Sequence, residues 1–113
     1  MSVPEPVTFC FVDTTHQEYF VATTSDPQVI ERARAELQLP LDQRTLHISG
    51  PISKGTNGNA PWTWHFLDNT WTLSELSMEL CDGWPSYIEQ NLDQWMSEVG
   101  SFCPWSSRVS EEL

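Results

Sequence analysis

Residues 7–12 read VTFCFV, and in this run Val7, Phe9 and Phe11 share one face. Such alternation of apolar and other residues is typical of a half-buried strand. Five polar residues, 13–17, separate it from a second β-prone run, EYFVAT (18–23). Two runs joined in this way predict a β-hairpin.

A helix follows the hairpin. Asp26 is suited to cap it, Pro27 to occupy its first turn, and Pro40 to stop it. Ile30 and Ala33 recur at helical spacing, so the chain predicts a helix over residues 27–38 with one apolar face.

The middle of the chain reads as strands again. We expect a strand at 45–49 closed by Gly50-Pro51, an exposed connection across 50–61, and a strand at 62–67. In the last of these, Trp62, Trp64 and Phe66 share one face. The spacing in 71–81 suits helix and strand alike, and we favour a short helical turn followed by a strand near 77–81.

A second helix is expected over 85–99, with Gly100 as its stop. The aromatic run 102–105 predicts a packed tail, and only 111–113 are expected to fray. The element order ββα-ββ(β)-α predicts an α+β fold: a mostly antiparallel sheet of four to five strands packed on two helices. With no repeat or linker, residues 1–113 are expected to form a single domain.

Composition narrows the function. The chain has 113 residues, with 16 acidic and 5 basic ones, and a net charge of −11. Five scattered cations argue against nucleic acid and against anionic membranes as partners. The start, MSVPEP, lacks the features of a signal peptide, so the chain either stays inside a cell or is a mature secreted form. Six Trp in so short a chain are expected mostly in the core.

Chemistry-bearing motifs are weak. A nucleophilic Cys–His pair has no local motif here. A zinc site from His47, His65 and a cysteine lacks the usual ligand spacing, and the acidic residues at 68, 75, 79 and 82 do not form an EF-hand loop. The 54–59 turn lacks the residues of a phosphate loop. We therefore expect no enzyme, no metal and no cofactor.

Several segments together resemble a known family. They are TSDP (24–27), RTLHISG (44–50), WTWHF (62–66), ELCDG (79–83) and CPWSSRV (103–109). The chain resembles, over nearly its whole length, the family named for the N-terminal domain of a slime-mould calmodulin-binding protein, whose other members are largely small bacterial proteins. The resemblance implies protein binding rather than catalysis. Calmodulin itself is not expected as a partner, because its targets are basic amphipathic helices and residues 85–99 contain no Lys or Arg.

Three cysteines allow one disulfide. Cys81 and Cys103 flank the second predicted helix, and they can meet only if both flanks fold back along it. Both lie in segments that match the family, and on that ground we predict a Cys81–Cys103 bridge, with Cys10 free or paired to another chain. The alternative is three reduced, buried thiols.

The favoured function is a small protein-binding module. One alternative is a protease inhibitor that presents the 50–61 loop, with Lys54 in an acidic specificity pocket. Another is a carbohydrate-binding domain that stacks sugars on exposed rings among Trp62, Trp64, Trp71 and Trp84. The predicted contact residues are Lys54, Asn57, Asn59, Trp105 and Arg108, the last two with a structural alternative in which Trp105 covers the sheet end and Arg108 pairs with a carboxylate.

Overall fold

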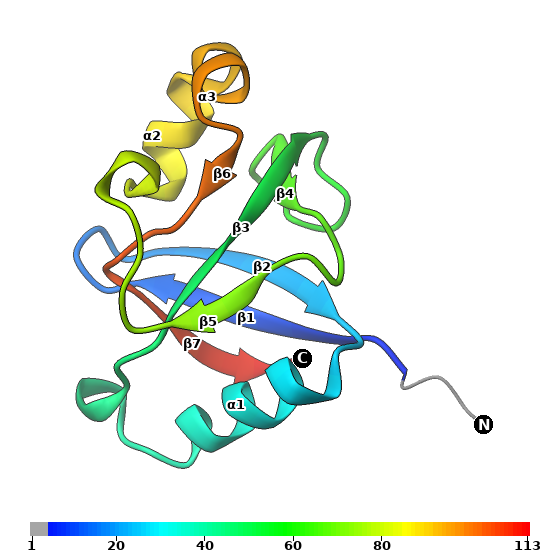
Figure 1. Cartoon of the computed structure of the whole chain (residues 1–113), viewed down its shortest axis with the longest axis vertical. Helices are drawn as coiled ribbons and strands as arrows, with labels where there is room; N and C mark the ends of the chain where they lie inside the picture. The colour runs from blue at the N-terminus through cyan, green and yellow to red at the C-terminus, as the bar shows by residue number, and fades with distance from the viewer. Residues whose placement is uncertain (1–4) are drawn as a thin grey trace.

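The computed structural model describes residues 5–113, which form two antiparallel sheets and three α-helices (Figure 1). One sheet has the strand order β2-β1-β7, and the other has the order β4-β3-β5 with β6 also paired to β3. The strands are β1 (Val7–Asp13), β2 (Glu18–Thr24), β3 (His47–Lys54), β4 (Trp64–Phe66), β5 (Thr72–Ser74), β6 (Ser101–Phe102) and β7 (Ser107–Glu112). The helices are α1 (Pro27–Leu37), α2 (Pro85–Gln90) and α3 (Leu92–Glu98), with 3-10 turns η1 (Leu41–Gln43) and η2 (Glu79–Cys81).

The predicted α+β class is confirmed, but the described residues contain seven strands and three α-helices rather than four to five and two. The N-terminal hairpin is as predicted, with Val7 opposite Thr24 and Asp13 opposite Glu18. Its turn is closed by the buried carboxylate of Asp13, which accepts hydrogen bonds from the backbone N–H of Thr15 and His16.

The helix α1 begins as predicted and ends within one residue of the expected position. Asp26 accepts a hydrogen bond from the N–H of Gln28 at 2.9 Å and so caps the first turn. At the other end, Glu36 is buried, and its Oε1 accepts from the N–H groups of Thr45 (3.0 Å) and Leu46 (2.7 Å). The start of the next strand is thereby tied to the helix.

The strand β3 does not end at Gly50-Pro51 as predicted but continues to Lys54. It pairs first with β5, then with β6 at Gly50 and Pro51, and finally with β4. A Cβ at Gly50 would lie 2.7 Å from the Cα of Trp71, so only glycine permits this close approach. Because residues 50–54 belong to a sheet, the exposed 50–61 connection is wrong over its first half.

Two further strand predictions need correction. The strand expected at 62–67 shrinks to β4, in which Trp64 and Phe66 are buried while Trp62 lies outside it. In 71–81 the predicted order is reversed, because the strand β5 comes first and η2 occupies the place of the predicted strand. His47 is opposite Ser74, so any extension of β5 would have to pair with residues 45 and 46, whose N–H groups Glu36 already holds.

The C-terminal part also departs from the prediction. The expected 85–99 helix is broken at Asn91, which has φ −124° and ψ 29° and donates from Nδ2 to the carbonyl of Tyr87. Such side-chain bonds to the backbone compete with helical ones. The tail does not fray: β7 runs to Glu112, and the N–H of Leu113 donates to the carbonyl of Thr8 at 2.9 Å.

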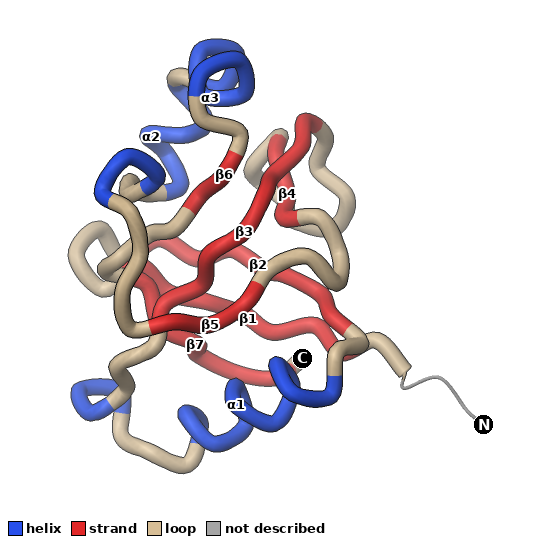
Figure 2. The backbone as a smooth tube through the Cα atoms, in the orientation of Figure 1, coloured by secondary structure: helices blue, strands red, loops and turns tan. Residues whose placement is uncertain are grey.

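The core is aromatic and lies between the two sheets, which Figure 2 shows one in front of the other. Phe20 stacks on Phe11 of its own sheet at 5.3 Å and meets Phe66 of the other at 5.8 Å. Three tryptophans, Trp64, Trp71 and Trp95, are buried, and Trp62 packs against the core from its edge. Most of the tryptophans are therefore core residues, as predicted.

Candidate functional site

Three of the most exposed large apolar side chains of the described residues lie on the segment between β5 and α2. Leu76 is 89% exposed, Met78 69% and Leu80 65%. They alternate along the chain and are accompanied by exposed carboxylates at Glu75 and Glu79. We refer to residues 75–82 as the disulfide loop. An apolar cluster left in water in this way typically marks an interaction site.

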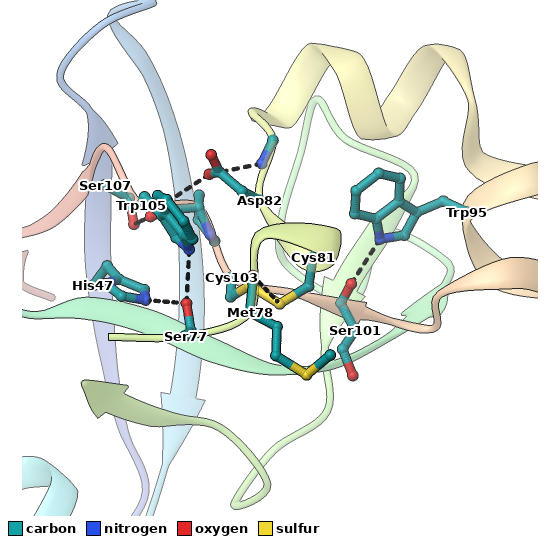
Figure 3. The surroundings of a disulfide bond; sticks show 12 residues. His47, Ser77, Met78, Cys81, Asp82, Trp95, Ser101, Cys103, Trp105 and Ser107 are labelled. Carbon is teal, nitrogen blue, oxygen red and sulfur yellow. Dashed lines mark hydrogen bonds between the residues drawn. A yellow bond between two sulfur atoms is a disulfide. The ribbon is translucent and has the colours of Figure 1, made fainter. Parts of the chain in front are cut away.

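The disulfide Cys81–Cys103 fastens the C-terminal end of this loop, as Figure 3 shows. The two Cα atoms are 5.1 Å apart, and the N–H of Cys103 also donates to the carbonyl of Cys81 at 2.8 Å. Cys103 is fully buried, so the bridge connects an exposed turn to the interior. The predicted pairing is confirmed.

A polar latch holds the middle of the loop. The indole N–H of Trp105 donates to Ser77 Oγ at 2.8 Å, and Ser77 Oγ lies 2.6 Å from Nε2 of His47 (Figure 3). Since Ser77 accepts from the indole, its own proton is available for Nε2 of a neutral His47 ring. With Ser77 directed inward, its neighbours Leu76 and Met78 face solvent.

Burial lowers the pKa of His47, and the charge of Arg108 lowers it further, while Asp82 acts in the opposite direction. The neutral ring that the latch needs is therefore the favoured form at neutral pH. Asp82 has a second task, since its Oδ1 accepts from the N–H of Gly83 (2.9 Å) and of Trp105 (2.8 Å). The loop is thus fixed at Ser77, Cys81 and Asp82.

Hollows adjoin the exposed side chains. One, of about 380 Å³, lies between the loop and the strands β3 and β6 and is lined by Leu76, Met78 and Leu80. A smaller one, of about 130 Å³, is lined by Leu76, Trp105 and His47. The apolar side chains therefore form an uneven surface into which a partner's side chains can fit.

The residues predicted from sequence fall in three different settings. Trp105 is partly exposed and belongs to the loop's support, and it approaches Ser77 rather than covering a sheet end. Lys54 lies at the far end of β3 from His47 and forms an ion pair with Asp93. Asn57 is exposed near it and lies 3.2 Å from His65 Nε2 through its amide nitrogen.

Asn59 and Arg108 have backbone partners. The prediction of an exposed Asn59 is wrong: it is 1% exposed, accepts from the N–H of Val21 at 2.8 Å and donates to the carbonyl of Trp64 at 2.9 Å. Arg108 does not pair with a carboxylate among residues 5–113, and its guanidinium donates to carbonyl oxygens, including that of Arg44 at 2.7 Å.

Sequence reasoning missed Leu76, Met78 and Leu80 as surface residues. It assigned them to the interior face of a helix or a strand. The usable signal was their position directly before Cys81, between two glutamates, because a bridged cysteine commonly anchors an exposed turn.

The alternatives fare differently. Trp64 and Trp71 are buried and cannot stack on a sugar, while the Trp84 ring already stacks on His16 at 4.3 Å. Within residues 5–113 no three His, Cys, Asp or Glu side chains gather as a metal site. Burial raises the pKa of the Cys10 thiol, with Glu111 adding to the effect, which disfavours the nucleophilic thiolate.

Comparison with known proteins agrees with the resemblance seen in the sequence. The model of the calmodulin-binding-protein N-terminal domain family matches residues 5–113. No curated protein and no solved structure matches the chain. In the described part of the chain, no helix is both long enough and apolar enough to cross a membrane.

Proposed function

The chain belongs to the calmodulin-binding-protein N-terminal domain family, and from this premise we propose that it is a non-enzymatic module that binds another protein through the disulfide loop. The observation that carries the proposal is the exposure of Leu76, Met78 and Leu80 on a segment that is fixed in place. Burying such side chains in a partner contributes about 1.5–3 kcal/mol each.

Rigidity of the loop supports the same function. Binding normally costs about 0.5–1.5 kcal/mol for each side chain that is immobilised, and more where a loop must be ordered. The Cys81 bridge and the Ser77 latch order the backbone before any partner arrives. The loss of conformational entropy on association is correspondingly small.

Charge indicates the chemistry of the partner. Glu75 and Glu79 are exposed on the loop, and the whole chain carries a net charge of −11. An apolar pocket with a basic rim is the complementary surface. The association rate should then fall as salt is added, because long-range attraction between opposite charges is screened.

The test compares two pairs of leucines. Leu76→Ser with Leu80→Ser alters the loop, whereas Leu39→Ser with Leu67→Ser alters exposed leucines elsewhere and serves as the matched control. Each protein is immobilised and exposed to extract of the source cells, with a photo-crosslinking residue at position 78. We expect one partner that crosslinks to position 78, is retained by the control and is lost from the loop variant.

Equal retention by both variants would place the contact elsewhere on the surface. Failure of the unaltered chain to retain any protein would contradict the proposal that it is a binding module.

Protease inhibition remains a second candidate, now with the disulfide loop in place of 50–61. Met78 has the extended backbone angles φ −70° and ψ 140°, and its side chain projects into solvent three residues before the bridge. A rigid extended segment of this kind fits a protease cleft with an apolar specificity pocket. Stoichiometric titration of serine proteases tests it: Met78→Gly should abolish inhibition, whereas inhibition that depends on Lys54→Ala instead would return the reactive loop to 50–61.

A further inference from the structure

A second feature lies away from the disulfide loop's exposed leucines, on the outer face of the β2-β1-β7 sheet. It is a cavity of about 690 Å³ with Val12 at its floor and Tyr19 and Leu41 among its walls. Its volume lies in the range of small-molecule sites. Arg44 and Arg108 also line it, which places two of the chain's five cations at one cavity.

Strand register explains how the floor and walls come together. Val12 is opposite Tyr19 on β2 and opposite Arg108 on β7. Directly opposite residues lie about 4.5–5.5 Å apart on the same face of a sheet. An aromatic ring and a guanidinium therefore flank one apolar side chain, and the residues after α1 bring Leu41 and Arg44 over them.

Backbone carbonyls hold both guanidinium groups without neutralising them. Arg44 donates from Nε to Leu39 O at 3.0 Å and from Nη1 to Val109 O at 2.7 Å. Arg108 donates from Nε to Arg44 O at 2.7 Å and from Nη1 to Trp105 O and Ser107 O.

Neither arginine forms an ion pair within residues 5–113, although Arg34 and Lys54 do. Asp42 lines the same cavity, yet it is not within ion-pair distance of either. Two oriented positive charges thus remain available at the cavity of a strongly acidic protein.

We propose that this cavity binds a ligand with a single terminal carboxylate on an apolar body. The carboxylate is held by the forked donors of Arg44 and Arg108, since guanidinium and carboxylate match in geometry and charge. The apolar body lies against Val12, Tyr19 and Leu41. A monoanion fits better than a phosphate dianion, because the net charge of −11 repels the doubly charged group more strongly.

The experiment is a titration of the isotope-labelled chain followed by amide chemical shifts. The probes are 3-phenylpropionate and its neutral analogue 3-phenylpropionamide, each added to about 20 mM because fragments of this size bind with Kd near 1 mM. We expect saturable shifts at Val12, Tyr19 and their neighbours with the acid only. Equal binding of the amide, or shifts confined to other regions, would overturn the proposal.

Variants provide an independent readout. Arg108→Gln should weaken binding of the acid by about tenfold or more, whereas Arg32→Gln, an exposed arginine on α1, should change it less than about twofold. Should Arg108→Gln fail to fold, Tyr19→Ala removes an exposed wall and is expected to weaken binding by several-fold. No change in Tyr19→Ala and in any folded Arg108→Gln protein would refute the site.

Two sources of the same carboxylate are distinguished by peptides. An N-acetylated tripeptide ending in phenylalanine is compared as free acid and as C-terminal amide. Tighter binding of the free peptide than of 3-phenylpropionate assigns the site to a protein's C-terminus, and the reverse order assigns it to a small organic acid. Inorganic phosphate that binds more tightly than either would contradict the proposal.

Discussion

Removal of the Cys81–Cys103 bridge by Cys81→Ala with Cys103→Ala should destabilise the fold by about 3 kcal/mol. The bridge closes a loop with a sequence separation of 22, and the chain-entropy relation gives that value at 25 °C. For 113 residues, the typical unfolding entropy of about 2.1 cal/mol/K per residue converts it to a fall in Tm of about 14 °C. The native contacts at Ser77 and Asp82 remain, so the variant should still fold.

Urea unfolding measures this loss, with Cys10→Ala as the control because Cys10 is outside the bridge. The slope of the free energy against urea should increase, since an unbridged chain exposes more surface when it unfolds. Amide hydrogen exchange at 76–80 should accelerate more than exchange at β1. A loss below about 1 kcal/mol, or an equal loss in Cys10→Ala, would refute the view that the bridge fixes the loop.

Two further perturbations test the interior. Asn59→Ala should cost about 2–4 kcal/mol in urea unfolding, because it strands the buried N–H of Val21 and carbonyl of Trp64; a cost equal to that of the exposed Asn57→Ala would contradict this. Below pH about 6.5 stability should decline, because the lowered pKa of His47 means that the folded state binds fewer protons than the unfolded state. Unfolding measured against pH should show a weaker decline in His47→Gln, and an identical decline would exclude His47 as its source.

Local signals sufficed for the first third of the fold. The alternation of Phe9 and Phe11 and the Asp26 cap each act within a few residues, so the hairpin and α1 could be predicted. The same reasoning failed at Gly50, where glycine normally indicates a turn. Here glycine is needed because Trp71, which is distant along the chain, comes within 2.7 Å of any added Cβ.

The candidate site was missed for a similar reason. Leu76, Met78 and Leu80 carry the alternation of a buried strand, and only the availability of a partner strand decides whether they become one. Glu36 removes that possibility, because its carboxylate occupies the N–H groups of Thr45 and Leu46 that lie beyond the last pair of β5 and β3. A contact between α1 and the start of β3 therefore leaves a distant segment outside the sheet, which periodicity cannot reveal.

Stability does not explain why this segment is apolar. Leu76 and Met78 are not part of the core, and the loop is held instead by Ser77, Cys81 and Asp82. Polar residues at the apolar positions would preserve every one of those contacts and lessen the hazard of aggregation that exposed leucines bring. Apolar side chains kept in water on a rigid support have a physical rationale when a second molecule buries them, and this is the reasoning that favours the disulfide loop as the contact surface.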